Sequence, residues 1–227
     1  NLFNKQLKSN NLNVLNVNYN AKVAFENNSS KSNKYIENCF KEAFKILKTR
    51  KINKLINGPI VKKTFLKKKY LGVTEYIAKK FNQKKYAMLI YNKELSVCPV
   101  TTHLPLKNVV KKITKKLIRE KIIIVNDFFK KNFGFKPKIG VVGLNPHCES
   151  INKYNEDEKI LFPVINSMKK KFFIKGPIPS DTIFLRNNRK KFDVIIGMYH
   201  DQVLAPLKTL YEYDAINITL GLPFLRV

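Results

Sequence analysis

The sequence predicts an α/β fold whose sheet is mainly parallel and carries helices on its faces. Short apolar runs typical of strands alternate with helical patterns along most of the chain. Each of the three histidines also stands where such a run gives way to a turn. With 227 residues and 44% hydrophobic residues, the chain is long and apolar enough for one or two globular domains.

The elements follow one another in a regular order. Helices are expected over 35–53, 74–81, 109–132 and 156–170, and strands over 54–57, 86–91, 95–101, 138–143 and 192–198. In 109–132, apolar residues share one helical face and lysines lie on the other. Acidic residues 156–158 suit a helix N-terminus. The Asn-rich residues 1–34 are expected to form weak strand and loop.

The formal net charge of +28 raises the alternative of a basic nucleic-acid-binding module. Arginine, the better residue for bidentate contacts to phosphates and bases, occurs only five times, so 44 basic residues minus 5 leaves 39 lysines. The lysines are spread along the whole chain in pairs and triplets, as in 67–69 and 169–171. We interpret them as a solvated surface, and the nucleic-acid module stays a remote alternative.

The cysteine pattern and the chain ends bear on the cellular compartment. Cys39, Cys98 and Cys148 are far apart and form no Cys-x-x-Cys pair, which favours a reducing compartment over a disulfide framework. No apolar run reaches the length of a membrane helix, and the start has no signal-peptide pattern. The cytoplasm is therefore expected. Both ends look cut rather than finished, so we expect an internal fragment.

The histidines are His103, within 99–105; His147, within 141–147; and His200, within 194–201. Ligands bind at the carboxyl ends of strands in open α/β sheets, because the loops there converge on one crevice. Three imidazoles from three strand ends would bind a divalent metal and leave a position open for substrate. Zinc, cobalt or nickel suits such ligands better than magnesium. The alternative for each histidine is an ordinary surface or core residue.

Two carboxylates stand in suitable places near these turns. Segment 176–182 is a Pro-bracketed loop that presents Asp181, unless Ser180 or Asp181 only caps the following turn. Asp201, directly after His200, is able to orient an imidazole or to accept a proton.

Three polar residues follow at intervals of nine: Lys208, Asn217 and Arg226. Each one alone is typical of a surface. Together they would supply charge and hydrogen bonds for a phosphate or carboxylate group. No glycine-rich nucleotide motif is present, so the residues alone name no nucleotide.

Five segments carry a resemblance to a known family. They are Thr101–Leu106 (TTHLPL), Gly143–His147 (GLNPH), Gly176–Thr182 (GPIPSDT), Tyr199–Gln202 (YHDQ) and Asn217–Phe224 (NITLGLPF). In this order and spacing, from about Gly58 to the end, the chain resembles the 4-hydroxythreonine-4-phosphate dehydrogenases of vitamin B6 synthesis.

The resemblance implies a two-domain α/β/α fold similar to that of the isocitrate and isopropylmalate dehydrogenases, acting as a homodimer. Residues 1–72 and 206–227 would belong to the first, incomplete domain and 73–205 to the central domain, with the active site in the cleft between them.

The resemblance also implies roles for individual residues. The metal ligands would be His103, His147 and His200, the third coming from the other subunit, and the metal would be zinc, cobalt or magnesium. Substrate contacts would fall on Thr74, Lys208, Asn217 and Arg226. Asp201 and Lys208 are candidates for the group that takes the hydroxyl proton.

The implied reaction is the NAD- or NADP-linked oxidation of 4-phosphohydroxy-L-threonine. Its product, a 2-amino-3-oxo acid, would decarboxylate to 3-amino-2-oxopropyl phosphate in pyridoxine 5'-phosphate synthesis. The alternative substrate is a related phosphorylated four-carbon acid, 4-phospho-erythronate or 4-phospho-threonate.

The sequence departs from the family pattern in several places. Val73 stands where the family usually has a histidine that contacts substrate, so weaker substrate binding is expected. Cys148-Glu149-Ser150 replaces the common Ala-Gly-Glu. The family's first strand and its nucleotide-binding segment beyond Arg226 are missing from the sequence. We therefore leave the cofactor-binding residues unassigned, and expect weak dinucleotide binding and weak folding of the chain alone.

Overall fold

The computed structural model describes residues 10–21, 23, 26–27, 29–66, 69–70, 72–151 and 154–227. The chain divides into two compact units, one of residues 1–52 and 59–68 and the other of residues 53–58 and 69–227. The predicted division into 1–72 with 206–227 and 73–205 stays a prediction. Two other expectations, for the start of 1–34 and for Lys67 and Lys68, lie outside the described residues.

The first unit contains helices α1 (Ser30–Lys48) and α2 (Lys62–Phe65). Helix α1 begins earlier than expected because Ser29 and Ser32 form a capping box, with Ser32 N donating to Ser29 Oγ (3.2 Å) and Ser29 N to Ser32 Oγ (2.8 Å). Phe40 of α1 stacks on Phe65 of α2 at 5.7 Å between ring centroids. The weak strand expected within 1–34 is not found among the described residues before α1.

The described residues of the second unit form one eight-stranded sheet in the order β1-β8-β7-β2-β3-β6-β4-β5. The strands are β1 (Lys54–Leu55), β2 (Ala87–Tyr91), β3 (Ser96–Pro99), β4 (Ile139–Val142), β5 (Ile174–Ile178), β6 (Val194–Gly197), β7 (Ile216–Leu220) and β8 (Leu225–Arg226). Strands β3, β6, β4 and β5 pair in parallel. Strands β3, β2, β7 and β8 pair antiparallel. The predicted α/β class with a mainly parallel sheet is confirmed.

The helices of this unit connect the strands. They are α3 (Val73–Lys80), α4 (Leu106–Lys112), α5 (Lys115–Phe133), α6 (Phe162–Met168), α7 (Ser180–Ile183), α8 (Arg186–Arg189) and α9 (His200–Tyr211), with a 3₁₀ turn at Pro146–Cys148 and a π-helical turn at Asp157–Leu161.

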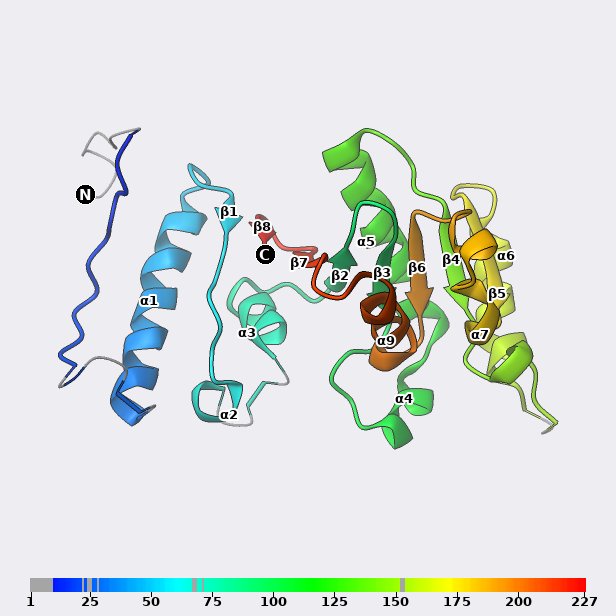
Figure 1. Ribbon diagram of the computed structural model, residues 1–227, viewed down its shortest axis with the longest axis horizontal. Helices are drawn as coiled ribbons and strands as arrows, with labels where there is room; N and C mark the ends of the chain where they lie inside the picture. Colours follow the sequence, from blue (N-terminus) through cyan, green and yellow to red (C-terminus); the bar gives the residue numbers. More distant parts are fainter. Residues whose placement is uncertain are drawn as a thin grey trace. The chain divides into compact units, whose positions relative to one another are not determined.

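Alternate strand residues face two separate cores, so the sheet lies between two helical layers (Figure 1). Leu89, Val141 and Ile196 pack with Ile122 of α5 and Ile165 of α6, all buried. Their neighbours, including Met88, Ile90 and Ile195, pack with Val203, Leu204 and Leu207 of α9 and Ile183 of α7. Each fully buried aliphatic side chain stabilises the fold by about 1.5–3 kcal/mol relative to exposure. The α/β/α layering implied by the resemblance follows from this alternation.

The single helix expected over 109–132 is wrong in one respect, because the structure has two helices, α4 and α5. Ile113 is extended (ψ 115°), and Thr114 caps α5 by accepting a hydrogen bond from Leu117 N (3.2 Å). The apolar face continues across the break, and for this reason periodicity alone did not reveal it.

The predicted loop 176–182 is strand β5 followed by α7. Pro179 occupies the N-cap of α7, and neither Ser180 nor Asp181 caps the helix through its side chain. The expected helix over 156–170 is likewise divided, into the π-helical turn and α6.

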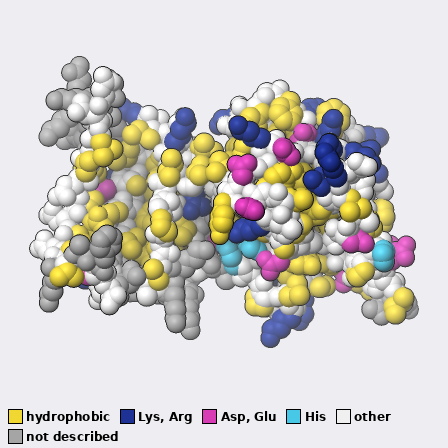
Figure 2. All heavy atoms as spheres, in the orientation of Figure 1, with side chains coloured by type: hydrophobic (Ala, Val, Ile, Leu, Met, Phe, Trp, Pro, Cys, Tyr) yellow, Lys and Arg dark blue, Asp and Glu magenta, His cyan; other side chains and the backbone are white. Residues whose placement is uncertain are grey.

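Lysine and arginine side chains lie in several separate groups on the face drawn in Figure 2, with acidic groups between them, as expected for a solvated surface. Among the described residues, no helix has the length and apolar character needed to cross a membrane.

Candidate active site

Three neighbouring parallel strands deliver the three histidines. His103 follows β3, His200 follows β6 and His147 follows β4, and these strands are adjacent in the order β3-β6-β4. Because parallel strands end at one edge of the sheet, the three loops share that edge. Thr101 ties two of them together, since its backbone N–H (3.2 Å) and its hydroxyl (2.8 Å) both donate to the carbonyl of Met198.

His103 and His200 lie side by side, with 5.8 Å between their ring centroids. His147 lies in the 3₁₀ turn after β4 with a left-handed backbone (φ 55°) and an exposed side chain. Histidine atoms lie at two separate places on the face shown in Figure 2. Within the described part of this single chain, no three His, Cys, Asp or Glu side chains form a group that would hold a metal. The three-histidine metal site stays a prediction.

His200 is held by its neighbour in the sequence. Its Nδ1 lies 2.7 Å from Oδ1 of Asp201, a side chain that is 82% exposed. Both residues stand in the first turn of α9. The Asp201 carboxylate therefore fixes the imidazole through Nδ1 and leaves Nε2 as the atom available to a ligand. The expectation that Asp201 could orient an imidazole agrees with this contact.

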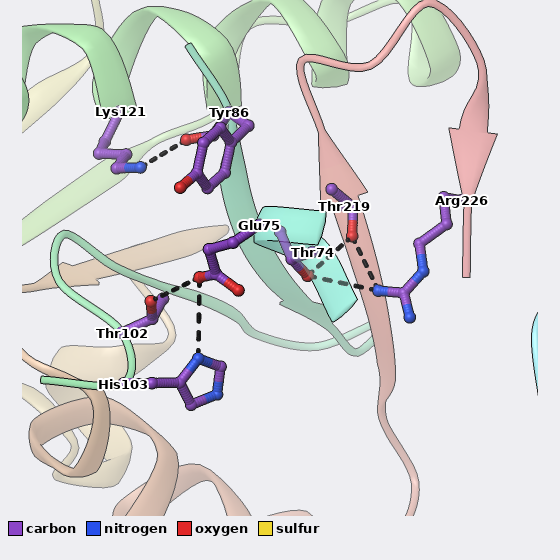
Figure 3. Close-up of polar contacts among 8 residues, drawn as sticks. All are labelled: Thr74, Glu75, Tyr86, Thr102, His103, Lys121, Thr219 and Arg226. Atoms are coloured by element: carbon purple, nitrogen blue, oxygen red, sulfur yellow. Dashed lines mark hydrogen bonds and ion pairs between the residues drawn. The ribbon is translucent and has the colours of Figure 1, made fainter. Parts of the chain in front are cut away.

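His103 has a carboxylate partner that the sequence analysis missed. Oε1 of Glu75, on α3, lies 3.7 Å from His103 Nδ1 and accepts a hydrogen bond from Thr102 Oγ1 at 3.3 Å (Figure 3). Burial raises the pKa of the Glu75 carboxyl, but the hydrogen bond and charge of His103 and the hydrogen bonds from its own backbone and Thr102 outweigh it, so the pKa is lowered overall. Glu75 directly follows Thr74, which was predicted to contact substrate.

Glu75 and His103 also depend on a glycine. A Cβ added to Gly72 would come within 2.7 Å of Glu75 Oε2 and 3.2 Å of the His103 ring. Oε2 is buried and has no hydrogen-bond partner among the described residues. A buried carboxylate oxygen in this state is costly, so this corner is a candidate for a functional role.

A buried arginine with three polar partners lies beside this corner. The buried Arg226 on β8 donates from Nη1 to Thr219 Oγ1 (2.9 Å) and Thr74 Oγ1 (3.4 Å), and from Nε to Asn57 Oδ1 (2.8 Å). Helix α3 turns Thr74 toward Arg226 and Glu75 toward His103 (Figure 3). Burial lowers the pKa of the Arg226 guanidinium, which the charge of Glu75 partly opposes. Thr74 and Arg226, predicted to contact substrate, are thus brought together, and Thr219 is an additional member.

The other two predicted substrate residues lie in exposed positions. Asn217 pairs with Ile90, and Thr219 pairs with Met88, so Asn217 and Thr219 point to the sheet face that α9 covers. Lys208 is exposed on α9, seven residues after Asp201. On a helix this places Lys208 on the same face as Asp201, two turns and about 10 Å away.

A cavity of about 230 Å³ opens beside the Glu75–His103 pair, lined by His103, Glu75, Thr74, Tyr86 and Lys121 among others. Lys121, on α5, is buried and donates to the carbonyl of Tyr86, with its ammonium group 5.3 Å from the Tyr86 ring centroid (Figure 3). Burial lowers the pKa of Lys121, and nearby Cys98, Glu120 and Glu75 oppose this shift. The amphipathic pattern of 109–132 did not indicate that one of its lysines would be buried.

Comparisons with known proteins place the chain in a family. Residues 2–227 match the family model described as pyridoxal phosphate biosynthetic protein PdxA. A 4-hydroxythreonine-4-phosphate dehydrogenase of Sulfurihydrogenibium sp. (strain YO3AOP1) is 40% identical over 217 residues, which are 92% of this chain and 66% of that protein. A D-threonate 4-phosphate dehydrogenase of Pectobacterium atrosepticum is 36% identical, covering 83% of this chain and 59% of that protein.

A solved structure has the same fold. The 4-hydroxythreonine-4-phosphate dehydrogenase of Klebsiella pneumoniae superposes with a TM-score of 0.75 at 30% identity, over 86% of this chain and 61% of that one. The chain thus spans less than two thirds of the relatives it matches. Because the family model covers nearly every residue, the chain belongs to the PdxA family, the pyridoxal phosphate biosynthetic proteins.

Proposed function

We propose that this chain carries the metal- and substrate-binding part of an NAD(P)-linked dehydrogenase that oxidises 4-phosphohydroxy-L-threonine. The oxidised product would lose its carboxyl group to give 3-amino-2-oxopropyl phosphate, in the synthesis of pyridoxine 5'-phosphate. The family match and relatives such as the Sulfurihydrogenibium enzyme support the reaction class.

The observation that carries the proposal is the pair of imidazoles at two parallel strand ends. His103 and His200 are 5.8 Å apart between ring centroids, and each has a carboxylate facing Nδ1, from Glu75 and Asp201. Metal-binding histidines usually carry such a partner on the other ring nitrogen. The residues therefore fit a divalent ion at the two Nε2 atoms, with His147 as the third ligand.

The third ligand also supports the proposed homodimer. A single chain does not gather three such ligands among its described residues, so one imidazole would come from a second copy. The resemblance assigns that role to His200, whereas His103 and His200 of one chain are neighbours. We therefore propose a site shared between two subunits, and experiment has to determine which histidine the second subunit contributes.

The chain's own groups would bind and orient the substrate. A metal ion bound at the histidines, of which zinc or cobalt suits imidazole best, would supply Lewis-acid polarisation of the substrate hydroxyl, and NAD or NADP would accept the hydride. Arg226 and Lys208 would hold the anionic groups, and the hydroxyls of Thr74 and Thr219 would complete a cradle around Arg226.

Asp201 and Lys208 are the two candidates for the group that accepts the hydroxyl proton. Asp201 is bound to His200 and therefore stands next to the proposed metal, whereas Lys208 is two helical turns away. An acceptor must reach the hydroxyl within hydrogen-bond distance, directly or through one water. Asp201 lies nearer to the proposed metal than Lys208 does, but because it binds Nδ1, on the side of the ring away from Nε2, it would reach the hydroxyl only through a water.

A second substrate is favoured by Val73. This buried valine opens α3 directly before Thr74, at the place where the family usually has a substrate-binding histidine. The Pectobacterium relative named D-threonate 4-phosphate dehydrogenase is 36% identical to the chain. The alternative is therefore the oxidation of 4-phospho-threonate or 4-phospho-erythronate at the same metal site.

The test is a turnover assay on the full-length protein. NAD(P)H absorbance is followed with 4-phosphohydroxy-L-threonine and, separately, with each alternative acid, in the presence of cobalt or zinc and then of a chelator. Chelator-sensitive turnover of the first substrate is the expected result. Chelator-sensitive turnover of only an alternative acid would support the metal site and change the assigned substrate. Turnover that continues in the presence of the chelator would refute the metal site.

A further inference from the structure

The loop that carries His147 has an unusual backbone. His147 (φ 55°) and Cys148 (φ 61°) are both left-handed, a conformation that residues other than glycine rarely adopt. Two such residues in a row persist only where the surrounding structure holds them in place. The residues that hold this loop therefore decide where the His147 imidazole lies.

Asp157 holds one side of the loop. Its carboxylate is fully buried, and it accepts hydrogen bonds from Leu144 N (2.7 Å), Asn145 N (2.9 Å) and Asn145 Nδ2 (3.0 Å). The backbone N–H of Asp157 is in turn bound by Asn155 Oδ1 at 2.9 Å. The acidic residues expected to stabilise a helix N-terminus thus include one whose carboxylate binds the neighbouring loop.

Gln202 holds the other side and reaches a second histidine loop. Its Nε2 donates to the carbonyl of Gly143 (2.7 Å), and its Oε1 accepts from Met198 N (2.7 Å). Gly143 lies four residues before His147, and Met198 lies two residues before His200. One buried amide therefore joins the end of β4 to the end of β6 with two short hydrogen bonds.

Close packing around Gly143 leaves no room for a side chain at this position. A Cβ there would lie 2.5 Å from Cys148 Sγ and 3.0 Å from Asp157 Oδ1. The buried Cys148 thus packs in the turn.

We propose that Asp157 and Gln202 are positioning residues that set the place of His147 relative to the end of β6, and thereby the affinity of the metal site. The inference rests on the proposed function, because His147 needs to be a ligand. Gln202 fixes the spacing between two loops, and Asp157 fixes the turn that follows. Neither residue is among the proposed metal ligands or substrate contacts.

The test measures cobalt binding to the full-length protein by titration and by the ligand-field absorption spectrum of the ion. Gln202→Leu removes both hydrogen bonds, and Asp157→Asn removes the carboxylate that accepts three. Each change is expected to weaken cobalt binding about 10- to 100-fold and to alter the spectrum, as loss of residues that orient metal ligands does. Gln202→Glu, which keeps only the bond from Met198 N, is expected to lose affinity as well.

A control separates positioning from general stability. Leu207→Ala, in the same helix α9, removes a buried apolar side chain, which forms no hydrogen bond to either loop. It is expected to lower the melting temperature while the cobalt affinity and spectrum stay unchanged. Affinity that follows melting temperature equally in Leu207→Ala and Gln202→Leu would overturn the proposal.

The remaining outcomes distinguish this inference from the proposed function. If the protein binds no cobalt, both are refuted. If cobalt binds and His147→Ala binds it equally well, His147 is not a ligand, so the positioning role is refuted while metal dependence stands. If Asp157→Asn fails to fold, the two Gln202 variants decide the question.

Discussion

The two halves of the sheet present their functional groups in different ways. The parallel half, β3-β6-β4, places its histidines in loops beyond the strand ends. The antiparallel half, β2-β7-β8, places Thr219 and Arg226 on paired strand residues, which are each other's register partners. The parallel half thus carries imidazoles in the loops at its edge, and the antiparallel half carries a buried cation, Arg226, on a strand.

The difference teaches how one sheet can hold two kinds of ligand. Loop residues depend on bridging hydrogen bonds such as those of Thr101 for their position. Arg226 is fixed by strand pairing and by three side-chain partners. We therefore expect changes in the parallel half to affect metal binding and changes in the antiparallel half to affect substrate binding, with little exchange between them.

The largest expected effect is on metal binding. Replacing both His103 and His200 by alanine removes two imidazoles from the proposed site and is expected to lower cobalt affinity by more than about 100-fold, beyond the loss typical of orienting residues. Titration with cobalt measures it. A double variant that still binds cobalt as tightly as the natural chain would place the metal elsewhere.

The next effect separates the two halves. Arg226→Met keeps most of the side-chain volume but removes the charge, and hydrogen bonds to charged groups are worth about 1.5–3 kcal/mol. The KM for the phosphorylated substrate is expected to rise about 10- to 150-fold. Cobalt affinity is the internal control and should stay within a few fold. If cobalt affinity falls with substrate binding, the proposed separation is wrong.

A smaller change would sharpen the substrate assignment. Val73→His restores the residue usual in the family, and one additional hydrogen bond to an anionic substrate is expected to lower KM about tenfold. Val73→Phe is the matched control, because it has similar bulk and no hydrogen-bonding nitrogen. An unchanged KM in the histidine variant would contradict the expectation that valine weakens substrate binding.

The smallest expected effect concerns Lys121 of α5, which donates a hydrogen bond to Tyr86, directly before β2. Its pKa is lowered by burial, so between that lowered pKa and the ordinary lysine range the unfolded chain binds more protons than the folded chain. Its contribution to the free energy of unfolding should therefore become more favourable as pH rises through this window. Lys121→Met should remove that rise, whereas the exposed Lys116→Met should keep it; chemical denaturation at several alkaline pH values measures both.

Much of the fold was predictable from the sequence because apolar runs mark buried strands directly. Strands β2, β3, β4 and β6 lie where they were expected. Strands β7 and β8 were not predicted: β7 begins with the exposed Ile216 and Asn217, and β8 has only two residues, so neither carries a strong pattern. The break between α4 and α5 was not predicted because the helical backbone ends before Thr114 while the apolar face continues across it.

The site was predictable where a single residue type identifies it and not where partners are distant in sequence. Histidines are rare in this chain, so their places stood out. Glu75 was missed as the partner of His103 because only the fold brings these two remote residues together. Thr219 was missed as the partner of Arg226 because neither β7 nor β8, which pair the two residues, was predicted. Asp157 and Gln202 were missed in the same way, as their neighbours in the sequence suggest a helix start rather than a loop contact.

The pairing of β6 with β3 and β4 also has a kinetic consequence. Ser96 pairs with Val194, and Ile139 pairs with the same residue from the other side, so the edge that carries the histidines closes only through contacts between remote parts of the chain. Such long-range pairings form slowly, because loop-closure entropy is lost before they stabilise anything. The proposed metal site would therefore form late in folding, and added cobalt should stabilise the folded chain without speeding its refolding.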